Sequence, residues 1–351
     1  MEVTTVSQNE HNCPDCRETA PGVDRRDFLK TAGAVVAVGS VPGLVRSVSA
    51  GEAAQASTPE SIVGHLYESL TPGQREKICF DWNYMDPERG LLRTRVANNW
   101  QITEPAINDD FYTDDQRQMI LDIFHGIVRP EWHERYAKQM EDDCGGFGFE
   151  QSIAIFGTPG EDQCEFVLTG RHMTLRADGN SQENVAFGGP IFYGHAADGF
   201  DEGAKHPGNV FWPQAVAANR VFEMLDGKQR ELALVKSLPA ENAVAFRAGG
   251  YPGMPVSEMS SDQQEEVGKV LAKLIEPYRA GDQKEALECL AAQGGLDKCS
   301  LAFYQDGDIG DDKVWDCWRL EGPAFVWYFR GAPHVHVWVN VASDPSVKTN
   351  S

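Results

Sequence analysis

Basic residues are scarce in this chain of 351 residues. Lysine and arginine together number 31, against 53 aspartates and glutamates, so the net charge is −22 at pH 7. A surface of that sign repels the phosphate backbone of nucleic acids and the anionic headgroups of lipids. The composition therefore predicts no nucleic-acid partner and no attraction to a membrane surface.

Long apolar runs are missing as well. The apolar stretch at residues 31–45 is rich in glycine and shorter than the ~20 residues that a membrane span needs, so we expect no stable membrane anchor. It follows the segment DRRDFLK at residues 24–30, in which Arg25 and Arg26 are paired and Asp24 stands where serine or threonine is usual. Paired arginines before a short apolar run are typical of a twin-arginine export signal.

This signal divides the chain. Small residues at 48–50, and again at 54–56, suit a signal peptidase, so we expect a signal peptide and leader at 1–50 and a single domain at 51–351. The twin-arginine translocase is the expected partner during export, and the mature chain is expected to be periplasmic or extracellular. Export in the folded state is useful when a metal or cofactor must be inserted first, which favours a metalloprotein.

Two common catalytic motifs are absent from the sequence. It contains no Gly-x-Ser-x-Gly, and the glycine-rich segment 145–148 lacks the lysine and the serine or threonine of a phosphate loop. Of the eight cysteines, Cys13 and Cys16 fall in the leader. The other six allow many disulfide connectivities, among which Cys289–Cys299 is our preferred local pair.

Four segments share one signature of a helix start: a Ser, Thr or Asp that can cap the first turn, and a Gln three residues later. Plain helix capping explains them, and no functional role is required. The sequence predicts eight helices, of which the first four below follow these segments: 72–80, 114–126, 227–236, 262–279, 58–69, 130–142, 213–224 and 282–293.

The expected strands form two regions. Runs of β-branched and aromatic residues predict a hairpin within 152–176 and a C-terminal four-strand meander within 300–341. Residues 188–209 are rich in Gly, Pro, Asp and His without periodicity, which indicates a long loop. Because helices and strands come in blocks, the predicted fold class is α+β: a predominantly antiparallel sheet that holds both β regions, flanked by about eight helices.

The sharpest local feature is His334-Val335-His336. In a strand, residues i and i+2 point to the same face, so these two imidazoles can bind one metal ion. His172, at an expected strand junction, is the first candidate for a third ligand, ahead of His195 and His206 in the expected loop. The alternative is a solvated or hydrogen-bonded strand face, because His-x-His also arises by chance.

Further polar groups could join the face that carries the histidines. If the turns of the meander are short, Tyr328 lies opposite His336, and Arg319 and Glu321 share the same face. Glu321 is then the candidate base. Arg319 or Tyr328 would stabilise developing negative charge.

These residues suggest an exported metal-binding protein, with a fourth metal position open for water or substrate. Zinc, which we prefer to copper, would support hydrolysis of a small-molecule substrate because the pKa of its bound water falls toward ~7. Copper in the same three-histidine site would imply redox chemistry. A non-catalytic periplasmic protein that binds a ligand or a metal is the alternative from a different class.

Four segments match a shared pattern: residues 167–175, residues 189–194, the helix start at 225–230, and residues 319–323 leading to His334-Val335-His336. Together they resemble the family known as domain of unknown function 3500, over most of the mature chain. Arg171 stands where that family has the first histidine of a Gly-His-His segment. The resemblance implies an exported bacterial protein. It also implies that His172, His334 and His336 belong together as one set of residues. It implies no particular activity.

Overall fold

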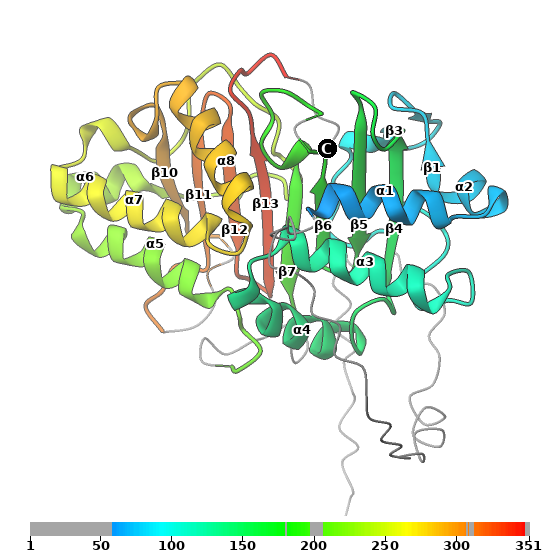
Figure 1. Cartoon of the computed structure of the whole chain (residues 1–351). Helices are drawn as coiled ribbons and strands as arrows, with labels where there is room; N and C mark the ends of the chain where they lie inside the picture. Colours follow the sequence, from blue (N-terminus) through cyan, green and yellow to red (C-terminus); the bar gives the residue numbers. More distant parts are fainter. Residues whose placement is uncertain (1–57, 180, 197–205, 307, 309–311, 348–351) are drawn as a thin grey trace, which may run out of the picture. The chain divides into compact units, whose positions relative to one another are not determined.

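The computed structural model describes residues 58–179, 181–196, 206–306, 308 and 312–347, and Figure 1 shows the whole chain. The predicted signal peptide, its cleavage positions, and Cys13 and Cys16 lie outside the described residues. Within those residues, no helix combines the length and the apolar character that crossing a membrane requires.

An eleven-stranded sheet forms the framework of the described part, and both predicted β regions belong to it. Ten strands form a continuous path, and the eleventh, β9 (Met254–Pro255), pairs with β10. A separate two-stranded sheet joins β2 (Met85–Asp86) to β3 (Gly90–Leu91). In spatial order the path is β1 (Cys79–Phe80), β4 (Gln151–Gly157), β5 (Cys164–Gly170), β6 (Met173–Ala177), β7 (Ile191–His195), β13 (Val335–Val341), β12 (Phe325–Arg330), β11 (Cys317–Gly322), β10 (Ser300–Tyr304) and β8 (Leu234–Val235).

The α-helices of the described part number eight, and each overlaps a predicted one. Figure 1 shows the longer ones in front of one face of the sheet, with α4 at one end of the strands. The four predicted capping boxes are formed, with Thr71, Thr113, Asp226 and Ser260 as N-caps. The α+β prediction is confirmed. The helices are α1 (Pro59–Ser69), α2 (Pro72–Ile78), α3 (Asp114–Ile127), α4 (Pro130–Cys144), α5 (Trp212–Met224), α6 (Gly227–Ala233), α7 (Ser261–Ile275) and α8 (Ala280–Ala292).

This series of elements occurs twice. Helices α1 and α2, strand β1, helices α3 and α4 and strands β4–β7 correspond in order to α5, α6, β8, α7, α8 and β10–β13. The sheet has the same order from either edge to its centre, where β7 and β13 pair antiparallel with Ile191 opposite Val339. A pseudo-two-fold axis therefore passes between these two residues. We call residues 58–196 the first half and residues 206–347 the second half.

Hydrogen bonds between helix starts repeat this symmetry. The side-chain amides of Gln74 and Gln116 bond to each other in the first half, and those of Gln229 and Gln263 do so in the second. Each glutamine also belongs to a capping box. The four boxes are thus two matched pairs, and each pair joins two helices of one half.

The prediction of one long loop at 188–209 is wrong, because β7 lies within it. This strand is at the centre of the sheet, with β6 on one side and β13 on the other. A Cβ added at Gly194 would lie 2.1 Å from the carbonyl oxygen of Val335. Strands β7 and β13 can therefore lie this close together only with glycine at position 194. A glycine and a histidine at the end of so short a strand hide its periodicity.

Two segments cross the face of the sheet opposite the helices. The first crossing segment, residues 81–106, follows β1, and its Trp100 packs on the side chains that β4 and β5 turn away from the helices. The second crossing segment, residues 236–253, follows β8, and its Val244 packs on the corresponding side of β10–β13. Among the described residues, both segments therefore cover the face of the sheet that the α-helices leave uncovered.

Each crossing segment is tied to the sheet by one buried glutamate between two arginines. In the first half, Arg93 and Arg176 each lie 2.8 Å from Glu165. In the second half, the Nε of Arg247 donates to Glu321 over 2.6 Å and Arg319 lies 3.0 Å from it. Buried charges are tolerated only when they are paired in this way.

The six cysteines of the described part are free thiols, so the predicted Cys289–Cys299 pair is not formed. Cys289 lies in α8, whereas the sulfur of Cys299 packs against Gly322 of β11. Both side chains are buried.

Candidate metal centre

The three predicted ligands converge at the end of the strands near α4. The Nε2 atom of His172 lies 3.1 Å from that of His334 and 3.2 Å from that of His336, and the last two are 2.7 Å apart. All three rings are buried. In the described part of the chain, this is the group of side chains able to hold a metal ion.

A turn positions His172. Gly170 pairs with Met173, so Arg171 and His172 form a two-residue turn between β5 and β6. His172 has a φ of 52°, a left-handed conformation that side chains other than glycine rarely adopt. The amide of His172 donates to Asn99 over 3.0 Å, and its carbonyl accepts from the amide of Gly194 over 3.2 Å. Contacts from the first crossing segment and from β7 thus hold the turn.

Strand alternation positions the other two histidines. His334 precedes β13 and His336 lies within it, with Val335 between them. The strand turns both rings to one side, as the sequence predicts.

Carboxylates lie behind two of the rings. The Nδ1 of His172 is 2.7 Å from Asp143, in the last turn of α4, and the Nδ1 of His336 contacts Glu241 of the second crossing segment. Asp143 also accepts from the amide of Ala196, and Glu241 pairs with Arg330. Both carboxylates are thus fixed by further contacts. Partners of this kind orient histidines that bind metals.

Proton positions explain why this cluster suits a cation. A neutral imidazole carries one N–H, and a neighbouring carboxylate draws it to the nitrogen that faces the carboxylate. The Nε2 atoms of His172 and His336 are then both acceptors, although they face each other. At most one proton, from His334, can lie between the three nitrogens, so lone pairs converge on one point.

The spacing fits a small metal ion. Two ligands at ~2.0–2.1 Å from a tetrahedral zinc ion lie ~3.3–3.4 Å apart. The observed separations of 2.7–3.2 Å are slightly shorter, so small ring movements would produce this geometry. The three histidines therefore fit a tetrahedral ion with a fourth position open.

Burial keeps the rings of His172 and His334 neutral. It lowers the pKa of His172 to about 4, although Asp143 acts in the opposite direction. Burial also lowers the pKa of His334, and the charges of the other two histidines add to the effect. Burial alone would raise the pKa of Asp143, but the charge and the hydrogen bond of His172 hold it below its ordinary value. A neutral imidazole is the form that binds a metal.

The predicted catalytic residues share this face but lie farther along it. Arg330, rather than Tyr328, is opposite His336, so the predicted register is wrong by two residues. Arg319 of β11 lies opposite Tyr328 of β12 in the sheet, and its guanidinium carbon is 5.5 Å from the centre of the tyrosine ring. Glu321 lies two strands away and four residues beyond the row of His336, roughly 15 Å from the cluster. The structure does not bring Glu321 to the histidines.

The other candidate histidines are placed differently. His195 ends β7 opposite Val335 and is buried beside the cluster, whereas His206 bonds to the amide of Gly208 outside any helix or strand. The sequence did not single out Asp143 or Glu241. Their partners are 29 and 95 residues away, so no local pattern could identify them.

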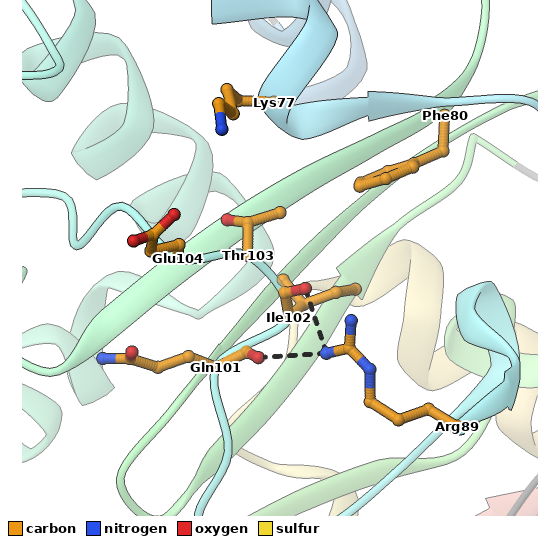
Figure 2. A pocket seen from close by; sticks show the side chains of 7 residues that line it. All are labelled: Lys77, Phe80, Arg89, Gln101, Ile102, Thr103 and Glu104. Carbon is orange, nitrogen blue, oxygen red and sulfur yellow. Dashed lines mark hydrogen bonds between the residues drawn. The ribbon is translucent and has the colours of Figure 1, made fainter. Parts of the chain in front are cut away.

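A cavity of about 350 Å³ lies elsewhere, between α2 and the first crossing segment. Figure 2 shows Arg89 directed at the backbone of residues 101 and 102, where its Nη1 donates to two carbonyl oxygens over 3.3 and 3.2 Å. Arg89 is also paired with Asp86 at 2.8 Å. None of the predicted site residues lines this cavity, and its arginine is already bonded.

The duplicated framework and the histidine cluster define an α+β protein with a candidate metal centre. The chain belongs to the family described as "Protein of unknown function (DUF3500)", whose model matches residues 52–340. A model of the TAT (twin-arginine translocation) pathway signal sequence matches residues 22–42, so the chain is exported from the cytoplasm by that pathway. Both predictions are confirmed. No curated protein and no solved structure matches the chain.

Proposed function

We propose that the exported protein binds one divalent metal ion, zinc in preference to copper, through the Nε2 atoms of His172, His334 and His336. The supporting observation is the convergence of three nitrogens, two of which belong to rings backed by carboxylates. Zinc sites commonly use such carboxylate–histidine pairs. Copper(I) favours sulfur ligands, which this set lacks.

Metal analysis of protein that was exported by its own signal and purified without a histidine tag tests this proposal. We expect about one zinc ion per chain, and loss of that ion in the double variant His334→Ala/His336→Ala. The exposed His65 provides the control, because His65→Ala removes an imidazole far from the cluster in the sequence. One copper ion per chain would favour redox chemistry, and a parent protein without metal would contradict the proposal.

We further propose a zinc-type hydrolase that acts on a small molecule. When bound, zinc supplies a water whose pKa falls toward ~7. The sequence nominates Glu321 as base and Arg319 or Tyr328 to stabilise negative charge, and the distance of Glu321 from the cluster disfavours a direct role. Glu241 is a nearer carboxylate, because its Oε1 accepts from the Nδ1 of His336.

Two conservative variants separate these roles. If Glu321 is the base, Glu321→Gln abolishes turnover and leaves the zinc content unchanged. If Glu241 orients His336, Glu241→Gln lowers the affinity for zinc by ~10–100-fold. Equal turnover and equal zinc affinity in both variants and the parent would contradict both assignments.

Burial of all three rings supports a second candidate, a non-catalytic protein that holds the metal. A panel of carboxylic and phosphoric esters, assayed with the zinc-loaded protein and with the His334→Ala/His336→Ala variant, separates the two. Hydrolysis that disappears in the variant supports the enzyme. A loaded protein that is inert toward the panel and releases zinc only slowly to a chelator supports the binding protein.

A further inference from the structure

The three histidine rings are buried, so an ion can reach them only if part of their surroundings moves. Three parts of the described chain contact these residues from outside the sheet: α4 and the two crossing segments. The part that is held by the fewest buried contacts opens at the lowest cost in free energy. The least constrained of the three is therefore the route by which an ion arrives.

Helix α4 and the first crossing segment are firmly held. In α4, the side chain of Asp143 is fully buried and accepts from Gln139 over 2.8 Å as well as contacting His172. In the first crossing segment, the backbone of Asn99 forms a bridge to that of Arg171, in the turn between β5 and β6. Opening on either of these sides would break buried or backbone hydrogen bonds.

Residues 237–243 of the second crossing segment, which we call the gate segment, are held differently. Each of them is exposed or half-buried. Among the described residues, their backbone-to-backbone hydrogen bonds stay within residues 240–244. Fixed points lie on both sides: the carbonyl of Lys236 accepts from the backbone just after β10 over 3.0 Å, and the carbonyl of the buried Val244 accepts from Asn340 over 2.9 Å. The gate segment is thus a short stretch between two anchors.

Side-chain contacts hold the gate segment against the site. The carbonyl of Pro239 accepts from the hydroxyl of Tyr328 over 3.4 Å, which is long for a hydrogen bond between two oxygens. The carboxylate of Glu241 pairs with Arg330 and contacts the Nδ1 of His336. The side chain of Glu241 is 14% exposed, so water can replace these contacts when they break. Glu241 is therefore the main contact between the gate segment and the cluster.

We propose that residues 237–243 are a gate through which the metal ion enters and leaves the cluster, and that Glu241 is the contact that closes it. When the gate opens, Glu241 leaves Arg330 and His336, while α4, the first crossing segment and the sheet keep their contacts. A metal ion on Nε2 makes the Nδ1–H of His336 a stronger donor, so an occupied cluster holds the gate closed more firmly than an empty one. The inference rests on the proposed metal site and specifies how its loading is controlled.

The rates at which cobalt(II) binds and is released, followed by its visible absorption, test the gate. Pro239→Gly gives the gate segment more conformational freedom and leaves Glu241 in place. We expect it to raise the rate of binding and the rate of release into excess EDTA about fivefold each, at an unchanged dissociation constant. Both rates rise together because the same opening precedes each step. Pro252→Gly, half-buried in the same crossing segment but beyond Val244, is the matched control and should behave as the parent does.

Hydrogen exchange in the parent protein is a second measurement, which needs no variant. Loading with cobalt should slow the exchange of amides in residues 237–243 more than in residues 245–253, which lie beyond the anchor at Val244. Equal slowing in both stretches, or none in either, would overturn the role of Glu241 in closing the gate.

The kinetic outcomes separate this inference from the metal site. Unchanged rates in Pro239→Gly with full cobalt loading overturn the gate and leave the metal site standing. A rise in the rate of release alone also overturns the gate, because the variant would then weaken the bound state. An equal rise in Pro252→Gly does so too, since the freedom of the whole crossing segment would then set the rates. A parent protein that binds no cobalt overturns both proposals.

Discussion

The two halves of the sheet have the same framework, and only one end of it carries the histidine cluster. Like His172, Ala324 is the second residue of a two-residue turn, between β11 and β12. His336 lies three residues before Val339 on the axis, and its counterpart three residues before Ile191 is Gly188. By the same relation, Ala186 corresponds to His334. The same framework therefore carries three histidines in one place and Ala324, Ala186 and Gly188 in the equivalent place. The candidate site is defined by the three histidine side chains and not by the fold.

The crossing segments differ in a second way. In the first half, Glu165 and both of its arginines are buried, whereas the side chain of Arg247 in the second half is 44% exposed. The second crossing segment also carries Glu241, which contacts His336. The second crossing segment thus places a carboxylate against the ring of His336, whereas Asn99 of the first accepts from the backbone amide of His172.

The largest effect that we predict follows from this difference in burial. Glu165→Gln leaves two buried arginines without a counter-charge and should lower the free energy of unfolding by about 3–5 kcal/mol. Glu321→Gln should cost less, because Arg247 is partly solvated. Urea denaturation of both variants measures this. Equal losses of stability would mean that the two glutamate–arginine clusters contribute equally to the fold.

The next effect concerns the strand pair that joins the halves. Gly194→Ala places a Cβ against the carbonyl of Val335 and should lower the free energy of unfolding by about 2–3 kcal/mol. Gly227→Ala is the control, because an added Cβ there meets nothing within 4 Å. The measurement is again urea denaturation. A Gly194→Ala variant as stable as the control would contradict the close pairing of β7 with β13.

The paired capping glutamines should respond alike. Gln116→Ala and Gln263→Ala each remove a capping bond and the two amide–amide bonds to the partner glutamine, and each should cost about 1–2 kcal/mol. Gln118→Ala, on the exposed side of α3, should cost less. Thermal unfolding of the three variants tests the pseudo-symmetry, which unequal losses for Gln116 and Gln263 would weaken.

The smallest effect depends on pH. Burial raises the pKa of Glu285 in α8 to about 7, so the stability that its protonated form provides is lost as the pH rises from ~4.5 through 7. Glu285→Gln should therefore raise the melting temperature at pH 8 and give no gain at pH 4. The exposed Glu288→Gln is the control. A gain of the same size at both pH values would contradict the raised pKa.

The first half should show the opposite trend. The pKa of His172 is lowered to about 4, so its contribution to stability is lost as the pH falls from ~6.5 through 4. Comparing the parent with His172→Gln across this range measures it. Loss of stability of the same size in both proteins on acidification would mean that His172 does not contribute.

Much of the fold could be predicted from the sequence because its signals are local. Capping boxes located four helices, and β-branched runs located most strands. The predicted helices and strands already contain the two matched series, but the four repeated capping segments alone indicate only helix starts and not a duplicated fold. β7 was missed because Gly194 interrupts its pattern, and so the strand that joins the halves was not expected.

The site could be predicted in part, for a related reason. His334 and His336 form a local pattern, and His172 was singled out at a strand junction. The contacts of Asp143 and Glu241 depend on how α4 and the second crossing segment pack against the sheet, which no spacing reveals. The misplaced register of Tyr328 followed from a wrong turn length, because five residues, 331–335, rather than three separate Arg330 from its strand partner His336.

The three histidines of this candidate centre come from both halves, and His172 and His334 are 162 residues apart. During synthesis, His172 is made long before His334 and His336. If the three histidines bind one ion, as we propose, that ion is captured only after β13 has docked against β7. Metal content would then report whether a molecule had finished folding before the translocase moved it.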